Sequence, residues 1–209
     1  MKQVQQLRKL NSMSFFDFET LSQLFDIERE SLYVNITRWT REGYLIQLKK
    51  GMYVTKEYYE SIADMKSYNE FIANQLRTPS YLSLEYVLSL NQVLTESVFL
   101  YSSVTSKTTR AYLNDLGSFS YRKISDKLFN GYKIVNKEPY NIAIATKSKA
   151  LFDYLYLQLF REKDITKDLI DDFRLNLDEF SESEIVEFNY YSTLSGIEKY
   201  SRLPNLLFG

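Results

Sequence analysis

The clearest pattern of apolar and polar positions along the chain lies near its beginning. Leu32, Ile36 and Trp39 stand at positions i, i+4 and i+7, and a helix would place all three on one face. Gly43 follows, a residue that can adopt the left-handed conformation in which many helices end. The pattern therefore predicts an amphipathic helix with a buried apolar face and a solvent-exposed opposite face.

A β-hairpin is predicted directly after this helix. Tyr44–Leu48 and Met52–Thr55 are short apolar segments, and a tight turn at Lys49, Lys50 and Gly51 can join them. Two more amphipathic helices are expected earlier in the chain, at Gln3–Leu10 and, after a capping Asp17, at Phe18–Phe25. Three helices and a hairpin in this order predict a winged helix-turn-helix of residues 1–60. The alternative is a small α+β unit in which the helix and hairpin serve packing alone.

The rest of the chain, residues 61–209, predicts a second domain of mixed α/β character, which makes the fold class α+β. Tyr58–Leu76 is expected to be a connecting helix and Ser83–Leu90 a further helix. A small sheet is expected from four β-favouring segments, Ser97–Val104, Ser118–Ile124, Tyr132–Val135 and Tyr140–Ala145. Ala150–Phe160 is apolar on most sides and predicts a buried helix. Two or three acidic amphipathic helices are expected from Ile165 onward.

Composition removes most catalytic chemistry from consideration. The chain has 209 residues and contains no Cys and no His. It therefore offers no thiolate nucleophile, disulfide, Cys/His zinc site, Ser-His-Asp triad or histidine general base. We expect no catalytic residue, no cofactor and no metal, and keep a carboxylate-dependent metal enzyme as an alternative.

The nearest approach to a catalytic motif lies at Gly117, Ser118 and Asp126, which resemble the start of a nucleotidyltransferase signature. Two-metal catalysis needs paired acids, and Leu128 stands where the second carboxylate is required. The chain also lacks a Gly-rich loop that could cradle phosphates. A nucleotidyltransferase activity is therefore not expected.

The net charge of −1 is low for a DNA-binding protein, so the distribution of charge matters more than its sum. Residues 1–60 hold nine Lys and Arg against eight Asp and Glu, and residues 61–160 hold eleven against eight. Residues 161–209 hold six against eleven. The acid is concentrated at the C-terminal end, which leaves room for a cationic patch in the first 160 residues.

The sequence predicts neither a membrane-spanning segment nor a signal peptide. None approaches the roughly 20 apolar residues that span a bilayer. The first ten residues, MKQVQQLRKL, lack the apolar core of a signal peptide. We therefore expect a cytoplasmic protein without membrane association.

Two later segments resemble the AbiEi family of antitoxins. Ile72–Leu94, IANQLRTPSYLSLEYVLSLNQVL, is similar to the family's connector, which follows a wing like that of Lys50–Val54. Tyr140–Leu155, YNIAIATKSKALFDYL, is similar to a strand and helix of the same family. The matching positions are Pro79, Ser80, Tyr81, Ser83 and Leu84 in the first segment and Ile144, Ala145, Lys149, Ala150, Leu151 and Asp153 in the second. The resemblance covers residues 15–160 and departs at Lys147 and Ser148, where the family usually has Pro and Glu.

This resemblance implies a bacterial, cytoplasmic, two-domain antitoxin of a type IV abortive-infection system. The family's N-terminal winged helix binds inverted repeats in the promoter of its own operon and represses it. The C-terminal domain, here residues 61–209, would oppose a nucleotidyltransferase toxin without forming a stable complex with it. The protein would thus be a non-enzymatic transcriptional repressor.

Two sets of residues are candidates for DNA contact. If the third helix enters the major groove, the side opposite its apolar face meets the DNA. That side and its margins carry Ser31, Tyr33, Val34, Thr37, Arg38 and Arg41. Arg38 can bind guanine or phosphate through two hydrogen bonds, and Val34 can touch a thymine methyl. Lys49 and Lys50 at the hairpin tip suit a phosphate backbone.

Each of these assignments has a plainer alternative. The helix face can be ordinary solvated surface, with Glu30 and Glu42 partly neutralising its arginines.

In the second domain, a basic surface for nucleic acid or for opposing the toxin would consist of Lys107, Arg110, Arg122, Lys123 and Lys127. Scattered surface charge is the alternative there, and Tyr81 and Tyr86 are expected to be packing residues. At the level of function, the alternative is a protein-interaction module whose winged helix does not bind DNA.

Overall fold

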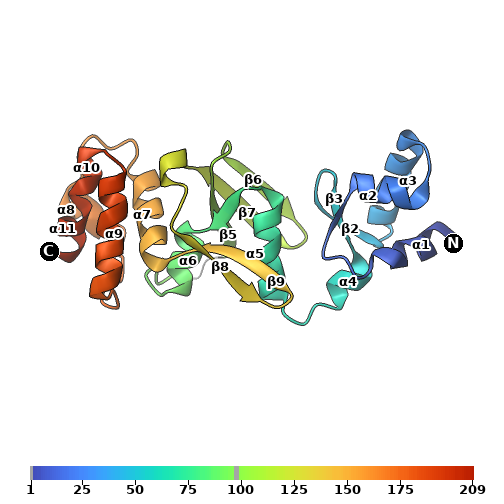
Figure 1. Ribbon diagram of the computed structural model, residues 1–209, viewed down its shortest axis with the longest axis horizontal. Helices are drawn as coiled ribbons and strands as arrows, with labels where there is room; N and C mark the ends of the chain where they lie inside the picture. The colour runs from blue at the N-terminus through green and yellow to red at the C-terminus, as the bar shows by residue number, and fades with distance from the viewer. Residues whose placement is uncertain (1, 97–98) are drawn as a thin grey trace. The chain divides into compact units, whose positions relative to one another are not determined.

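The computed structural model of the protein describes residues 2–96 and 99–209 (Figure 1). The chain is a mixed α+β protein that divides into two units. One unit consists of Met1–Tyr68 with Tyr112–Leu116, and the other of Asn69–Ala111 with Gly117–Gly209. No helix in the described part of the chain is long and apolar enough to cross a membrane.

The first unit combines short helices with a three-stranded sheet. Its elements are α1 (Lys2–Leu7), the 3-10 turn η1 (Arg8–Leu10), β1 (Phe16–Asp17), α2 (Phe18–Phe25), α3 (Arg29–Arg41), β2 (Leu45–Lys49) and β3 (Met52–Thr55). β2 and β3 form an antiparallel hairpin, and β1 pairs antiparallel with β3. The sheet order is therefore β1-β3-β2, with α2 and α3 inserted between β1 and the hairpin.

Interactions between neighbouring residues determine where α2 begins and where α3 ends. The Asp17 carboxylate accepts a hydrogen bond from the Thr20 backbone N–H at 2.9 Å, which caps α2 as expected. Gly43 has φ +78°, and the Tyr44 N–H donates to the Trp39 carbonyl at 2.9 Å. This left-handed ending is accessible to Gly at little cost and turns the chain from α3 into β2.

The apolar face predicted for α3 lies in the core of the first unit. Leu32, Ile36 and Trp39 are 0%, 4% and 0% exposed, and the Trp39 ring packs against Phe25 with centroids 4.8 Å apart. Burying side chains of this size stabilises a fold by about 1.5–3 kcal/mol each. The rotational position of α3 is therefore fixed, and its opposite face is directed to solvent.

The helix expected over Tyr58–Leu76 is in fact two helices, α4 (Lys56–Glu60) and α5 (Met65–Leu76). The Ser61 hydroxyl donates to the Tyr58 carbonyl at 2.7 Å where α4 ends. The Asp64 carboxylate accepts from the Ser67 N–H at 3.0 Å where α5 begins. The expectation was wrong because these two polar residues interrupt the helix without interrupting its apolar period.

The second unit is built on a sheet larger than the small one expected. The sheet contains β4 (Ser80–Leu82), β5 (Leu100–Thr105), β6 (Arg110–Asn114), β7 (Gly117–Lys123), β8 (Tyr132–Lys137) and β9 (Tyr140–Ala145), in the order β6-β7-β5-β4-β9-β8. Of these strands, β6 extends into the Tyr112–Leu116 segment that is grouped with the first unit. β4 pairs antiparallel with β5 and parallel with β9, and β5 pairs parallel with β7. β4 and β6 were not expected. The strand predicted at Ser97–Val104 begins at residues 97–98, which lie outside the described residues.

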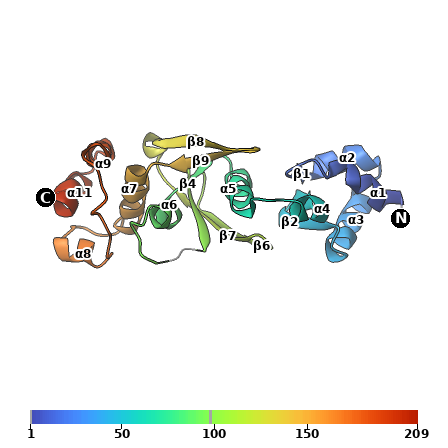
Figure 2. The same cartoon turned by 90° about the horizontal axis from the view of Figure 1, so that it is seen from below.

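Helices cover both faces of this sheet (Figures 1 and 2). α5 lies on one face, where the Tyr121 hydroxyl donates to the Ala73 carbonyl at 2.5 Å. α6 (Leu84–Leu90) and α7 (Lys147–Gln158) lie on the other, and α7 is buried as predicted. Beyond α7, the described chain continues in four short helices where two or three were expected, α8 (Lys167–Asp171), α9 (Glu182–Leu194), α10 (Glu198–Ser201) and α11 (Leu203–Phe208). α9 packs against the side of α7 that faces away from the sheet.

Candidate nucleic-acid interface

All six α3 residues predicted to contact DNA lie at the surface of the first unit. They are Ser31, Tyr33, Val34, Thr37, Arg38 and Arg41. Val34, which points directly away from the core, is 70% exposed, and Tyr33 at the margin is 44% exposed. Because Leu32, Ile36 and Trp39 anchor the other side, the helix presents these six residues as one continuous face.

Two polar side chains of this face, Thr37 and Arg38, form hydrogen bonds with other residues of α3. The Thr37 hydroxyl donates to the Tyr33 carbonyl at 2.9 Å, one turn earlier. The Arg38 guanidinium donates to the Asn35 side-chain oxygen at 2.9 Å and reaches Gln3 at 3.4 Å. Both of these Arg38 partners are neutral, so its charge is not compensated. With five N–H donors in all, Arg38 keeps donors for a further acceptor.

Arg29 belongs to the same surface although it was not predicted. Its guanidinium carbon lies 4.7 Å above the Phe18 ring, and its side chain donates to the Tyr33 hydroxyl at 3.4 Å. This hydrogen bond to the Tyr33 hydroxyl raises the pKa of the Arg29 guanidinium above its ordinary value. Tyr33 also stacks on Phe18 with centroids 4.5 Å apart, so its ring has a packing role. The i, i+4 spacing of Arg29 and Tyr33 on one helix is the signal that could have identified the contact.

The hairpin places its two lysines differently from each other. Lys49 is the last residue of β2 and is half-buried, whereas Lys50 is exposed in the turn with Gly51. Gly51 has φ +79°, and its carbonyl accepts from the Phe18 N–H at 3.2 Å. The turn is thus tied to the start of α2, and Lys50 is the cation at its tip.

Two acidic side chains accompany Arg38 and Arg41 at α3. Helical phase places Glu30 on the same side of α3 as Arg41, and Glu42 follows at the end of the helix. Neither acid forms an ion pair within residues 2–96 and 99–209. A polyanion at this face would meet these uncompensated carboxylates as well as Arg38 and Arg41, so its attraction would come from specific contacts more than from a strong field.

The five cations predicted as a basic surface in the second unit are all exposed but do not form one site. They are Lys107, Arg110, Arg122, Lys123 and Lys127. Arg122 and Lys123, at the end of β7, line a groove together with Arg161. Lys107, Arg110 and Lys127 are not among the residues that line it. The structure thus brings two of the five together and adds an arginine from a distant part of the sequence.

The two segments that carry the family resemblance meet in the core of the second unit. The Asp153 carboxylate accepts hydrogen bonds from Lys149 at 2.5 Å, from Ser83 at 2.9 Å and from Tyr81 at 3.0 Å. Lys149 also donates to the Leu128 carbonyl at 2.8 Å. All four of the matching side chains are fully buried. This buried network, defined by Tyr81, Ser83, Lys149 and Asp153, holds β4 to α7.

Burial also settles the role of the two tyrosines that could have been stacking platforms. Tyr81 is fully buried, and burial together with the Asp153 carboxylate raises its pKa, so its hydroxyl remains a donor. Tyr86 is also buried and donates to the Glu70 carboxylate at 2.6 Å. Both are packing residues, as predicted.

The described residues do not bring three acidic side chains together in an arrangement that could hold a metal ion. A comparison with models of known protein families finds none that matches the chain, and a search of curated proteins finds no match either.

Proposed function

We propose that the first unit is a winged helix-turn-helix and that the protein binds duplex DNA as a transcriptional repressor. The observation that carries this proposal is the order α1, β1, α2, α3, β2, β3 combined with the sheet order β1-β3-β2. In that arrangement α3 is the recognition helix and the β2–β3 hairpin is the wing. The surface position of all six predicted α3 residues supports it.

In this proposal each part of the surface has a distinct task. α3 enters the major groove, where Arg38 reads a base edge and Val34 contacts a thymine methyl. Ser31, Thr37 and Arg41 bind phosphates on either side of the groove. Lys50 at the tip of the wing binds the backbone further along the duplex, while the half-buried Lys49 contributes less.

We further propose that the repressor is an antitoxin of the AbiEi type. It would bind inverted repeats in its own promoter and oppose a nucleotidyltransferase toxin without a stable complex, in the cytoplasm and without enzymatic activity of its own. The support is the resemblance of Ile72–Leu94 and Tyr140–Leu155 to that family. The buried network gives this resemblance a physical basis, because residues matched in both segments contact one another.

DNA binding is tested by fluorescence anisotropy on the full chain. The probes are a labelled duplex from upstream of the chain's own gene and a random duplex of equal length, both at moderate salt. We expect the upstream duplex to bind about a thousandfold more tightly or better. We also expect the logarithm of its affinity to fall linearly with the logarithm of salt concentration. Equal affinity for the two duplexes would overturn the proposal.

A matched pair of lysine variants tests whether the β2–β3 hairpin contacts DNA. Lys50→Ala should weaken binding to both duplexes and reduce the salt slope by about 1. Lys133→Ala removes an exposed strand lysine from β8 and should change neither quantity. Identical behaviour of the two variants would remove the wing from the interface.

The antitoxin role has its own test. Expression of a nucleotidyltransferase encoded beside this gene should arrest growth, and co-expression of the present chain should relieve the arrest. The two proteins should not co-purify. Upstream-DNA binding without relief of the arrest would leave the repressor in place and contradict the antitoxin role.

A protein-interaction module is the second candidate. Val34 is 70% exposed on α3, and the exposed Glu30 and Glu42 lie beside Arg38 and Arg41, both of which suit a protein partner. A stable partner that protects Val34, together with equal affinity for the two duplexes, would favour this function.

A further inference from the structure

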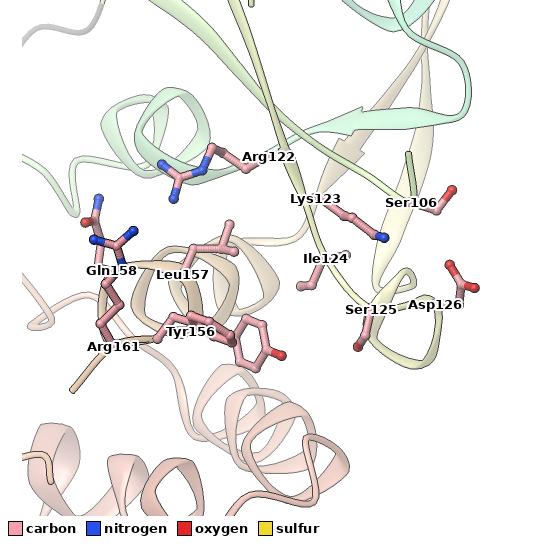
Figure 3. A pocket seen from close by; sticks show the side chains of 11 residues that line it. Ser106, Arg122, Lys123, Ile124, Ser125, Asp126, Tyr156, Leu157, Gln158 and Arg161 are labelled. Carbon is pink, nitrogen blue, oxygen red and sulfur yellow. The ribbon is translucent and has the colours of Figure 1, made fainter. Parts of the chain in front are cut away.

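A groove in the second unit lies between the end of β7 and the C-terminal half of α7 (Figure 3). Its volume is about 750 Å³. The side chains that matter for its chemistry are Arg122, Lys123, Asp126, Tyr156, Gln158 and Arg161. Cavities that bind small molecules typically enclose about 300–1,000 Å³, so the groove is large enough for a small ligand.

Three cations of this groove have no acidic partner. Within the described part of the chain, neither Arg122, Lys123 nor Arg161 forms an ion pair. Figure 3 shows the Arg122 and Arg161 guanidinium groups turned toward the end of the groove where the Gln158 amide also lies. Two planar guanidinium forks and an amide donor at one end match the oxygens of a phosphate group.

Aromatic surface lies beside these donors. Tyr156 lines the groove but is only 9% exposed, because its ring packs on Tyr200 with centroids 4.9 Å apart. Phe160 also lines the groove and follows one turn later, with its ring centroid 6.5 Å from that of Tyr156. Phe160 is 63% exposed, a large apolar ring left in water at the edge of the groove. Aromatic rings next to phosphate-binding cations form the usual setting in which a nucleobase stacks.

The other end of the groove carries both a carboxylate and the Lys123 ammonium. Asp126, in the 3-10 turn η2 (Asp126–Leu128), lies there beside Ser125, away from Arg122 and Arg161 (Figure 3). A carboxylate repels phosphate but accepts hydrogen bonds from ribose hydroxyls or from a base amino group. The two arginines and Gln158 thus lie at one end of the groove, and Asp126, as a nucleoside acceptor, lies at the other, toward which the Lys123 ammonium also points.

We propose that this groove binds a free nucleoside phosphate. Its phosphates lie at Arg122 and Arg161, and its nucleoside extends past Tyr156 toward Asp126. The proposal does not rest on DNA binding by the first unit, because every residue in it belongs to the second. It assigns a ligand to two of the five cations predicted as a basic surface and leaves the other three as solvated charge.

Isothermal titration calorimetry on the full chain tests the proposal with two kinds of probe. The four ribonucleoside triphosphates test for a nucleotide, and inorganic tripolyphosphate tests for an anion alone. At least one nucleotide should bind with a dissociation constant in the micromolar range and more tightly than tripolyphosphate. Equal binding of tripolyphosphate and all four nucleotides would reveal an anion groove only and overturn the proposal, as would the absence of binding.

Variants locate the ligand. Arg122→Gln combined with Arg161→Gln should weaken nucleotide binding at least about tenfold, since two charge-assisted hydrogen-bonding groups are lost. Lys123→Ala should weaken it less, and Lys133→Ala, a matched strand lysine on β8, should leave it unchanged. All of these side chains are exposed, and an unchanged thermal melt verifies that each variant is folded. Full nucleotide affinity in the double arginine variant would place the ligand elsewhere and overturn the proposal.

Asp126→Asn tests the orientation of the nucleotide. If Asp126 accepts from the nucleoside, this variant weakens nucleotide binding and leaves tripolyphosphate binding as it was or slightly stronger. An equal gain for both ligands would show that Asp126 only repels anions, and would overturn the nucleoside end of the proposal. A single-stranded 12-nucleotide RNA that binds while no free nucleotide does would replace the proposed ligand with a polynucleotide.

Discussion

Among the described residues, Arg38 on α3 is exposed and hydrogen-bonds to the neutral side chains of Gln3 and Asn35. Lys149 on α7, in contrast, is fully buried and ion-paired with Asp153 at 2.5 Å. The first cation can give its charge and donors to a ligand at little cost. The second has been removed from water, which is tolerated only because a carboxylate and further hydrogen bonds surround it. Its charge is used within the fold and is not available to a partner.

This difference changes what the family resemblance can mean. In the second unit, the matching residues Tyr81, Ser83, Lys149 and Asp153 are fully buried and satisfied by one another. A likeness at these positions therefore reports on the packing of β4 against α7. Any partner of the second unit has to be recognised by residues outside the motifs, such as those of the groove beside β7.

The largest change in stability is expected when the buried Lys149 is replaced. Lys149→Met leaves the Asp153 carboxylate buried without its counter-charge and should destabilise the second unit by about 3–5 kcal/mol. Urea unfolding measures the loss. The double variant Lys149→Met/Asp153→Leu should recover most of it, since both charges are then absent. A single variant within about 0.5 kcal/mol of the wild type, the range of ordinary surface substitutions, would contradict the structural role of Lys149.

Replacing the exposed Arg38 should change DNA affinity and leave the stability of the fold nearly unchanged. Arg38→Ala should leave the unfolding curve nearly unchanged and weaken binding to the upstream duplex by about 1–3 kcal/mol, with little effect on random duplex. Anisotropy titrations with both duplexes measure the difference. Lys133→Ala, which removes an exposed cation of the second unit that lies outside both proposed binding sites, serves as the control and should leave both affinities unchanged. Loss of both duplexes to the same degree in Arg38→Ala would remove Arg38 from base recognition.

A smaller effect is expected at the start of α2, where an exposed carboxylate serves the fold. Asp17→Ala should cost about 1 kcal/mol by removing the helix cap, whereas Asp17→Asn retains an acceptor for the Thr20 N–H and should cost less. Hydrogen bonds from the Thr20 backbone and side chain lower the pKa of Asp17. Its charged form therefore adds stability above the unfolded pKa of about 3.9, and this stability is lost as pH falls through the lower folded value. Melting curves between neutral and acidic pH should therefore show a smaller loss of stability in Asp17→Asn than in the wild type, while the remaining loss comes from other carboxylates such as Glu184, whose pKa is also lowered.

The elements that the sequence predicts correctly are those specified by nearby residues. The apolar spacing of α3, the Asp17 cap and the left-handed Gly43 each depend on contacts within a few positions. These three features alone orient the proposed recognition face. For the same reason, all six of its predicted residues lie at the surface.

The elements that the sequence does not reveal depend on distant partners. β4 has three residues, and its neighbours are β5, paired at Ser80↔Thr105, and β9, paired at Leu82↔Ile144. No local period identifies so short a strand. The groove follows the same rule, because Arg122 and Arg161 are brought together only by the packing of α7 near the end of β7.

In the proposed function, α3 and the β2–β3 hairpin of the first unit contact DNA and the second unit does not. Hydroxyl-radical footprinting of side chains, with and without the upstream duplex, tests it directly. Tyr33 and Val34 are exposed in the free protein and should be protected by the duplex, whereas Phe160 and Val186, at 63% and 69% exposure, should react equally in both states. Unchanged reactivity at Tyr33 and Val34, with protection of Phe160 or Val186, would contradict the account.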